Sequence, residues 1–451
     1  MRLLTAVDQL FLLLETRNQP MHIGGLFLFK LPDNADENFV HNLVQEMMHS
    51  KAPPTFPFNQ VLHHSLFWKT DPDLELEQHF RHIALPQPAR IRELLVYISQ
   101  EHGKLLNRAE PMWECHIIEG IEGNRFALYC KLHHSLVDGV AAMRLVKKSL
   151  SESPTERTNL PIWSLMTRYR HQIDSLIPDN KSLSHIVKEQ LFALPPVIRE
   201  LGKNVVERFN HNYIGTTEAP DSILNQPISS ARRVSAQGYE LARFQAIGKH
   251  FNVTLNDVVL AVCSGALRRY LLDMNALPKK PLIAFVPLSL REDDSSAGNQ
   301  VTFILANLGT HLSDPVERLT VINGSTKNSK GRFARMRQAS SIIYSGVVYS
   351  RAALQIVTGL FPEYRSFNLV ISNVPGSQKT LYWQGAELQD LYPLSIVLND
   401  QALNITLCTY VDKIEFSLVA DSHVLPKIQR LLTYFEDELQ SFEQVIASSK
   451  P

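Results

Sequence analysis

The feature that most constrains the fold is an apolar segment that runs into a short polar motif and then into an amphipathic segment. Residues 126–132 (FALYCKL) are typical of a largely buried strand. The polar motif, residues 133–139 (HHSLVDG), follows directly. Beyond it, the spacing of Ala142, Val146 and Leu150 predicts a helix with one apolar face. We therefore expect a strand, a loop and a helix, an arrangement that presents loop side chains to a cleft.

The two histidines of this loop, His133 and His134, are candidate catalytic groups. A neutral imidazole can take a proton from an alcohol or an amine near physiological pH. The alternative interpretation is a pair of core histidines beside an N-capping aspartate, Asp138, with Gly139 easing the turn. A second triplet, residues 63–65 (HHS), lacks the aspartate and the glycine, and for it we expect a structural or surface role.

The whole chain of 451 residues is long enough for two or three domains, and both halves mix helix and strand patterns. We expect an α/β (α+β) fold with an N-terminal lobe at 1–155, a helical crossover at 156–232 and a C-terminal lobe at 233–451. The crossover is polar and contains prolines, with charged helical segments around 186–209. In the second lobe we expect helices at 239–251, 256–272 and 426–447, and strands at 282–287, 367–371, 404–410 and 414–419.

Composition and motif searches exclude several classes of function. Lys+Arg and Asp+Glu both number 45, so no overall charge argues for nucleic acid. The chain has neither the glycine fingerprints of nucleotide-binding loops nor a metal-ligand cluster, since His79-x-x-His82 alone is weak evidence for a metal. The four cysteines form no CxxC pair. Three of them lie in apolar runs, which indicates reduced, buried thiols and an intracellular compartment.

The sequence predicts neither a secretory signal nor a membrane-spanning helix. Asp8 places a charge inside any signal core at the N-terminus. No window holds 18 apolar residues in a row, and the best one, residues 339–361, is interrupted by serines and Arg351. Attachment to a membrane surface stays open.

The motif 133–139 resembles the HHxxxDG signature of acyl-CoA-dependent acyltransferases with a chloramphenicol acetyltransferase-like fold. Further segments narrow the resemblance to the bacterial wax ester synthase/acyl-CoA:diacylglycerol acyltransferases, and they run in order from residue 8 to about residue 420. They are residues 8–11 (DQLF) with 20–25 (PMHIGG), 111–113 (PMW), 255–257 (LND), 287–291 (PLSLR), 373–376 (NVPG), and 385–386 (GA) ahead of 392–393 (YP).

The resemblance implies two chloramphenicol acetyltransferase-like lobes with the active site where they meet. It implies transfer of a long-chain acyl group from acyl-CoA, the co-substrate, to a fatty alcohol, diacylglycerol or both. His134 would be the general base that takes the proton of the acceptor hydroxyl. No covalent acyl-enzyme, metal or cofactor is implied, and the sequence contains no GxSxG nucleophile elbow.

The resemblance also suggests roles for the rest of the motif. His133 either takes part in catalysis or only holds the loop. Asp138 is expected to pair with an arginine that fixes the loop, and Arg291 is our candidate for that partner. Gly139 either clears space for the thioester or the CoA arm, or serves the turn.

Other matched residues have a structural interpretation beside the functional one. Asn256 and Asp257 either support the site or belong to a capping box that begins at Thr254. Trp113 is expected to form the wall of an apolar tunnel. The residues Asn373, Pro375 and Gly376 either make a tight turn or bridge the lobes near the acyl channel.

Between Glu317 and Glu363 the chain has no acidic residue. We interpret this stretch as a solvated helix face, a dock for CoA phosphates or a dock for anionic lipid headgroups. Its seven cations are Arg318, Lys327, Lys330, Arg332, Arg335, Arg337 and Arg351.

We therefore expect a cytoplasmic acyltransferase that attaches peripherally to the inner face of the cell membrane or to lipid bodies. Two alternatives stay open. One is a condensation-type acyltransferase of the same fold that takes its acyl group from a carrier protein. The other is a non-catalytic lipid-binding or lipid-body protein, against which the intact His134 and Asp138 argue.

Overall fold

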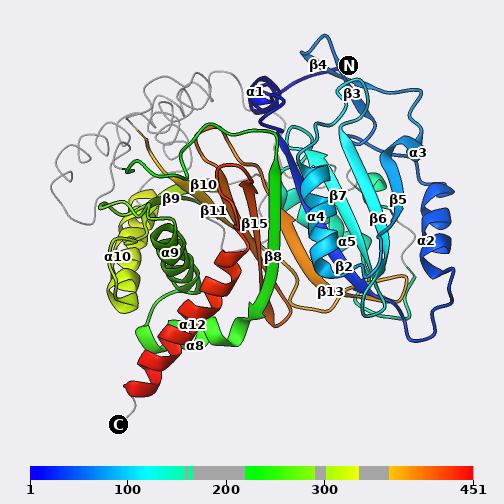
Figure 1. Ribbon diagram of the computed structural model, residues 1–451. Helices are drawn as coiled ribbons and strands as arrows, with labels where there is room; N and C mark the ends of the chain where they lie inside the picture. Colours follow the sequence, from blue (N-terminus) through cyan, green and yellow to red (C-terminus); the bar gives the residue numbers. More distant parts are fainter. Residues whose placement is uncertain (158–160, 166–218, 290–300, 335–364, 450–451) are drawn as a thin grey trace.

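Two six-stranded mixed sheets stand side by side and share helices at their junction (Figure 1). The structure is a computed structural model, and it describes residues 1–157, 161–165, 219–289, 301–334 and 365–449. No helix within these ranges is long and apolar enough to cross a membrane. The predicted crossover helices around 186–209 and the apolar window 339–361 lie outside the described residues, as does Arg291.

The N-terminal sheet has the strand order β12-β13-β2-β7-β6-β5. All neighbours are antiparallel except β5 and β6, which run parallel. The strands are β2 (His22–Lys30), β5 (Phe80–Ala84), β6 (Trp113–Ile121), β7 (Arg125–His133), β12 (Tyr382–Trp383) and β13 (Ala386–Leu394). The helices of this half are α2 (Phe39–Met48), α3 (Leu76–His79), α4 (Ile91–His102), α5 (Gly139–Ser149) and the 3-10 turn η1 (Ile162–Ser164).

A small three-stranded sheet and a short helix lie at the end of the N-terminal half, beside the N-terminus (Figure 1). The sheet has the order β1-β4-β3, from β1 (Arg2–Leu3), β4 (Phe67–Thr70) and β3 (Gln60–His63). Helix α1 (Ala6–Leu14) follows β1 and begins with a capping box between Thr5 and Asp8. The second histidine triplet lies at the end of β3 and in the following turn, which agrees with the structural or surface role expected for it.

The C-terminal sheet has the order β10-β9-β11-β14-β15-β8, with β11 parallel to both of its neighbours. Its strands are β8 (Arg232–Glu240), β9 (Ile283–Ser289), β10 (Val301–Asn307), β11 (Leu369–Val374), β14 (Leu403–Tyr410) and β15 (Lys413–Asp421). The helices are α8 (Leu241–Phe251), α9 (Leu255–Asp273), α10 (Pro315–Ala334) and α12 (Arg430–Ser448). The elements predicted for this lobe are confirmed, with ends that differ by a few residues.

One hairpin crosses from the C-terminal half of the sequence to the N-terminal sheet. Strands β12 and β13 follow β11 in the chain, yet β13 pairs with β2 from Glu387 opposite Lys30 to Leu394 opposite Gly24. The domain limits 1–155, 156–232 and 233–451 therefore stay predictions about the chain, and they do not describe which strands share a sheet.

The junction between the two halves is apolar and continuous. One buried cluster contains Leu94 and Ile98 of α4 together with Val234 of β8 and the cores of α9 and α12. A buried hydrogen bond from the Val234 amide to the Ser99 hydroxyl, at 2.8 Å, ties β8 to α4. A second cluster lies on the other face of the N-terminal sheet, under α2 and α5. All four cysteines are buried and unpaired thiols, as predicted.

Candidate active site

The motif 133–139 lies where β7 ends and α5 begins, so the predicted strand, loop and helix are confirmed. Its backbone is held by two distant segments. The His133 amide donates to the Met112 carbonyl at 3.0 Å, and the His134 amide donates to the Met21 carbonyl at 2.9 Å. These carbonyls belong to the PMW and PMHIGG segments, so three of the matched motifs converge on one loop.

The loop lies close to the junction of the two halves. Two residues just before Met21 contact the C-terminal half: the Gln19 side chain accepts from the Asn399 amide at 2.6 Å, and the Asn18 carbonyl accepts from Arg232 at 2.6 Å. Helix α5, which follows the motif, lies against β11. The location agrees with a reaction centre between the lobes.

His134 is half-buried, and its ring stacks on the ring of Phe11 from α1, with centroids 4.3 Å apart and planes within 11°. Burial lowers the pKa of His134, while its own backbone carbonyl and Asp138 act in the opposite direction. The net effect is a pKa below the ordinary value for histidine. The imidazole is therefore neutral near physiological pH, as a general base must be, and Asp138 favours the charged form that follows proton transfer.

His133 is fully buried, and both of its ring nitrogens face the protein. Nδ1 lies 2.6 Å from the Ser135 hydroxyl and accepts from the Ser135 amide at 3.2 Å. Because Nδ1 accepts, we assign the proton to Nε2, which lies 3.4 Å from a carboxylate oxygen of Glu15. This geometry favours the interpretation in which His133 holds the loop.

Glu15, at the end of α1, is a site residue that the sequence did not point out. Its side chain is only 3% exposed, and it accepts from the Met21 amide at 3.2 Å and from Arg108 at 2.9 Å. Burial alone would raise the pKa of Glu15, but His133, Met21 and Arg108 together hold it below the ordinary value. A charged carboxylate therefore lies beneath the histidine pair. The available signal was its position between the two matched N-terminal segments.

Asp138 caps helix α5, because its carboxylate accepts from the Ala141 amide at 2.8 Å. Its expected pairing with Arg291 stays a prediction. Gly139 lies at the first position of the helix, and a Cβ built on it would meet no atom of the described residues within 4 Å. Its φ is outside the left-handed region, so backbone strain does not require a glycine here. The open space beside Gly139 is consistent with room for a ligand.

A chain of buried polar groups continues from the motif along the sheet. His22 lies opposite His133 in the β2–β7 register, and its Nε2 lies 2.9 Å from the His102 carbonyl. His102 in turn reaches the Tyr129 hydroxyl at 2.8 Å, and burial lowers the pKa of His102 to about 3. Lys131 donates to the carbonyls of Glu101 and Lys104, and burial lowers its pKa to about 8. Burial also lowers the pKa of His22 well below its ordinary value. His22 and His102 are therefore neutral, and they pack as uncharged polar groups.

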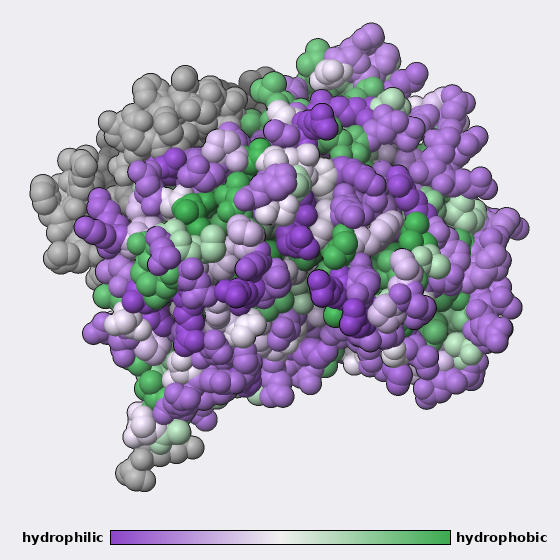
Figure 2. All heavy atoms as spheres, in the orientation of Figure 1, coloured by the Kyte–Doolittle hydropathy of each residue, from purple (hydrophilic) through white to green (hydrophobic). Residues whose placement is uncertain are grey.

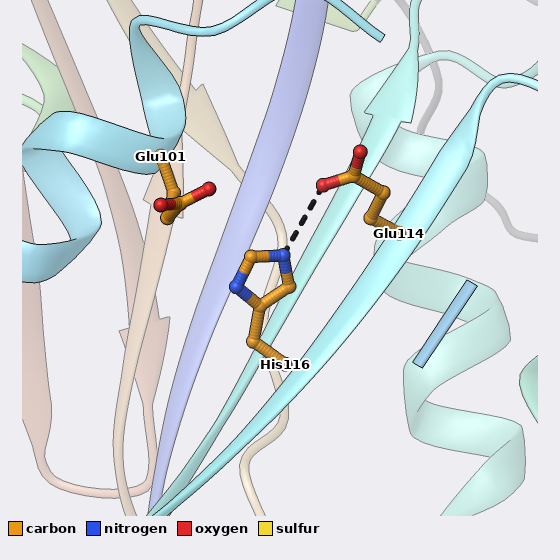
Figure 3. A group of neighbouring side chains, drawn as sticks. All are labelled: Glu101, Glu114 and His116. Atoms are coloured by element: carbon orange, nitrogen blue, oxygen red, sulfur yellow. Dashed lines mark hydrogen bonds and ion pairs between the residues drawn. The ribbon is translucent and has the colours of Figure 1, made fainter. Parts of the chain in front are cut away.

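Near these buried polar groups, the side chains of Glu101, Glu114 and His116 point toward one another (Figure 3). Their ligand-type atoms lie within 4.8 Å of one another, a convergence that the sequence search for metal ligands missed. Both carboxylates already face cations: Arg81 lies 3.9 Å from Glu101 and 3.6 Å from Glu114, and Lys104 pairs with Glu101. The group is a charge-balanced network, and the cations leave its carboxylates little free charge for a metal ion. His79 and His82 do not converge, since they contact Trp113 and Glu119 respectively.

Trp113 begins β6 and is buried in an aromatic cluster. Its indole stacks on His79 and on Trp163, and its Nε1 donates to the Phe58 carbonyl at 2.8 Å. It does not line the cavity of about 580 Å³ under α2 and α5. The tunnel-wall role of Trp113 stays a prediction.

The capping box predicted for α9 is confirmed, and Asp257 does more than cap. Besides Thr254, its buried carboxylate accepts from Asn323 at 3.1 Å and from Thr326 at 2.6 Å, both on α10. Burial would raise the pKa of Asp257, but these hydrogen bonds and the nearby Lys330 hold it below the ordinary value. Asn256, by contrast, has a buried amide nitrogen with no hydrogen-bond partner among the described residues. A site-supporting role for either residue stays a prediction.

The NVPG segment (373–376) covers the last two residues of β11 and the first two residues of the loop that follows. Asn373 and Pro375 are exposed, and a Cβ on Gly376 would lie 2.0 Å from the Thr409 carbonyl oxygen of β14. The close approach of this loop to β14 therefore requires a glycine at 376. The bridging of the lobes by this loop near the acyl channel stays a prediction.

The basic stretch is less uniform than its sequence indicates. Arg318 fits neither a solvated helix face nor a dock for anions, because its buried guanidinium pairs with Glu438 of α12. The charge of Lys330 helps to lower the pKa of Asp257. Lys327 is exposed on α10. Arg332 lies in the same helix, and the more distal cations lie outside the described residues.

A cavity of about 580 Å³ lies on the face of the N-terminal sheet that α2 and α5 cover. Its apolar walls include Phe27, Leu128, Val146 and Trp383, and none of the motif residues lines it. Val146 and its neighbours form the last turn of α5, the helix that begins at the motif. The volume is within the roughly 300–1,000 Å³ of small-molecule sites.

Fold and site together define the class of protein: an acyltransferase of the chloramphenicol acetyltransferase-like, two-lobe fold. The starter condensation domain of rhizomide synthetase has a similar fold, with a TM-score of 0.55 at 12% identity over 99% of this chain and 94% of that one. At that identity the likeness concerns the fold alone.

Closer relatives identify the family. Residues 4–259 match the wax ester synthase/diacylglycerol acyltransferase catalytic domain, and residues 297–443 match the WS/DGAT C-terminal domain. The chain is 53% identical to the O-acyltransferase WSD of Acinetobacter baylyi, over 100% of this chain and 99% of the relative. It is 39% identical to a putative diacylglycerol O-acyltransferase of Mycobacterium tuberculosis, over 98% and 100%.

A solved structure, the wax ester synthase/diacylglycerol acyltransferase from Marinobacter aquaeolei VT8, is similar throughout. It has a TM-score of 0.82 and 40% identity, and covers 99% of this chain and 100% of its own. The chain belongs to the wax ester synthase/diacylglycerol acyltransferase family and is an O-acyltransferase.

Proposed function

We propose that this chain transfers a long-chain acyl group from acyl-CoA to the hydroxyl of a fatty alcohol, of diacylglycerol, or of both, giving wax esters and triacylglycerols. The observation that carries the proposal is the state of His134. It is a neutral, half-buried imidazole at a loop that two distant carbonyls hold in place, beside an aspartate that favours its protonated form. These properties suit a general base that must release its proton again.

The reaction needs no proton or electron other than those of the two substrates. His134 takes the proton of the acceptor hydroxyl as the oxygen attacks the carbonyl carbon of the thioester. The tetrahedral intermediate then collapses, the carbon–sulfur bond breaks, and the imidazolium gives its proton to the CoA thiolate. An ester and CoA leave, and His134 is neutral again.

Two acidic residues assist without touching the reacting atoms. Asp138 lies on the same loop and stabilises the imidazolium electrostatically, because it raises the pKa of His134. Glu15 faces His133, the neighbour that holds the loop, so we assign it a positioning role. The open space at Gly139 leaves room for the thioester or the CoA arm.

The apolar cavity is our candidate site for the distal part of an acyl chain. Helix α5 connects the motif to it, and its 11 residues span about 16 Å at ~1.5 Å per residue. Polar and charged groups, among them Glu46, His49 and Lys51, line the rest of the cavity. An extended hydrocarbon with its carbonyl at His134 would fit this combination of length and apolar surface.

The acceptors of such a reaction partition into lipid, which supports a peripheral location. We propose that the protein works in the cytoplasm, attached to the inner face of the cell membrane or to lipid bodies. Acyl-CoA is water-soluble and would enter from the aqueous side.

The test is an assay of the purified protein with palmitoyl-CoA and detergent-dispersed hexadecanol or dipalmitoylglycerol, offered separately, in which released thiol and ester are followed. The His134→Ala variant should lose about a hundredfold to ten-thousandfold in kcat, the usual contribution of a general base. His64→Ala, in the other HHS triplet, is the matched control and should keep the activity of the unmodified chain. Failure of free acyl-CoA as donor, or full activity of His134→Ala, would overturn the proposal.

A further inference from the structure

We propose that one surface of the N-terminal half docks onto a phospholipid surface that carries anionic headgroups, and so delivers the acceptor lipid to the site. The inference rests on the proposed function, which it deepens by naming the part of the molecule that meets the lipid. The docking surface consists of Leu3, Leu10, Leu13, Leu66 and Phe67, on β1, α1 and the β3–β4 turn.

The small sheet presents apolar side chains on the face that solvent reaches. In its register, Arg2 lies opposite Trp68 and Leu3 lies opposite Phe67. Trp68 is 3% exposed, so its face packs inward, and the alternate face with Leu3 and Phe67 points outward. An antiparallel sheet with one solvated face normally carries polar residues there. Leu3 is instead 61% exposed, and the neighbouring Leu66 is 49% exposed.

Helix α1 continues this surface. Leu10 and Leu13, three residues apart, lie on one face of the helix and are 41% and 72% exposed. The backbone joins the two parts, since the Leu4 amide donates to the Leu66 carbonyl at 3.0 Å. Figure 2 shows hydrophobic residues at the surface at the top of the view, over α1 and the small sheet. A cluster of exposed large aliphatic side chains rimmed by polar groups marks an interaction surface.

The charge around these residues favours an anionic partner. Over residues 1–17 and 60–70, the exposed cations are Arg2, Arg17 and Lys69. The acidic residues in these segments are Asp8 and Glu15, and Glu15 is buried against Arg108. Lys69 lies directly opposite Val61 on the outward face of the sheet. Basic residues beside exposed aliphatic ones are typical of surfaces that bind anionic lipid.

The same helix reaches the catalytic loop from its other face. Phe11 stacks on His134, and Glu15 at the C-terminal cap faces His133. Helical spacing places Phe11 about 100° from Leu10 around the axis and still farther from Leu13. Helix α1 is therefore a thin layer between the docking surface and the general base. A lipid acceptor would travel only the width of one helix from the lipid surface to His134, and this short path favours lipid over a protein partner or a second copy.

The experiment measures vesicle binding of the full chain by flotation, with vesicles of phosphatidylcholine alone or with phosphatidylglycerol. The unmodified chain should bind the anionic vesicles, and added salt should weaken binding. The variant Leu3→Ser/Leu13→Ser/Leu66→Ser should bind at least tenfold more weakly, because each leucine loses its transfer into lipid. The matched control, Leu272→Ser/Met274→Ser, replaces aliphatic residues that are 47% and 41% exposed on and just after α9, and should bind normally.

Equal binding by the variant and the unmodified chain, or no vesicle binding by either, would overturn the inference. So would light scattering that shows a dimer for the unmodified chain and a monomer for the variant, since the surface would then meet a second copy. Acyl transfer from palmitoyl-CoA to detergent-dispersed hexadecanol is measured in parallel. If that transfer fails for the unmodified chain while vesicle binding follows the predicted pattern, the proposed function fails and the docking surface stands.

Discussion

At the scale of single residues, Gly139 separates a structural requirement from a functional one. A glycine is normally required at a helix start by a positive φ or by close packing. Neither applies here, because the φ of Gly139 is not in the left-handed region and, within the described part of the chain, no atom lies within 4 Å of a Cβ built on it. Gly139→Ala should therefore leave the free energy of unfolding unchanged or slightly higher, since alanine is the better helix former. If the space belongs to the thioester or the CoA arm, KM for palmitoyl-CoA should rise about tenfold.

Steady-state kinetics and urea denaturation of the same variant test this prediction together. A stable Gly139→Ala variant with unchanged KM would assign the open space to solvent. Loss of stability would instead mean that the backbone of the turn needs the glycine.

Glu415 of β15 makes the stability depend on pH. Its side chain is fully buried, and burial, with Asp390 next in size, raises its pKa to about 8 from an ordinary value of 4.5. Between these values the folded chain holds a proton that the unfolded chain has lost, so the free energy of unfolding falls as pH rises. From about pH 5 to about pH 8 the loss should be on the order of 3 kcal/mol.

The variant Glu415→Gln cannot ionise, so the difference in unfolding free energy between it and the unmodified chain isolates this one group from the buried histidines. Urea denaturation at several pH values should give a difference that grows with pH in favour of the glutamine. A difference independent of pH would show that the carboxyl ionises in the folded chain as freely as in the unfolded one.

At the scale of secondary-structure elements, Asp257 ties two helices together. Its carboxylate completes the capping box of α9 and accepts from Asn323 and Thr326 of α10. Asp257→Ala should cost about 2–4 kcal/mol, from a cap worth about 1 kcal/mol plus buried partners left unsatisfied. Asp8 provides the matched control, because it makes the same capping box in α1 with no second helix. Asp8→Ala should lower the free energy of unfolding by about 1 kcal/mol. If urea denaturation gave equal losses for the two variants, Asp257 would not link α9 to α10.

The elements that could be predicted from sequence are those defined by local periodicity. Strand β7, helix α5 and the α9 capping box depend on neighbours within a few residues, so the pattern at 126–150 and at 254–257 was sufficient. Contacts between distant residues were not predictable in this way. Arg318 finds its countercharge on Glu438, 120 residues away, and local composition therefore described it as unpaired.

The candidate site divides along the same line. The motif identified His134 and the Asp138 cap, because both residues lie within one short stretch of sequence. The partners Phe11 and Glu15 come from α1, more than 100 residues earlier in the chain, and only the folding of α1 over the loop brings them there. The crossing of β12 and β13 to the N-terminal sheet was also beyond local patterns, because strand pairing over such separations leaves no periodic signal.

At the scale of the whole molecule, the hairpin exchange and the shared core predict that the two halves unfold together. The β13–β2 pairing and the α4–β8 junction make each sheet depend on chain from the other half. Two probes can follow the halves separately. All four tryptophans lie in the buried cluster under α2 and α5, and they are Trp68, Trp113, Trp163 and Trp383. The long helices α9, α10 and α12 dominate the far-ultraviolet circular dichroism from the C-terminal half.

Urea denaturation should therefore give coincident transitions by tryptophan fluorescence and by circular dichroism, the signature of one cooperative unit. Weakening the junction should separate them. Ser99→Ala removes the hydroxyl that accepts from the Val234 amide, leaves that buried donor unsatisfied, and should cost about 1–3 kcal/mol. Two transitions in the unmodified chain would show that each half folds alone. The geometry of the active-site loop at their junction would then form only when the two folded halves associate.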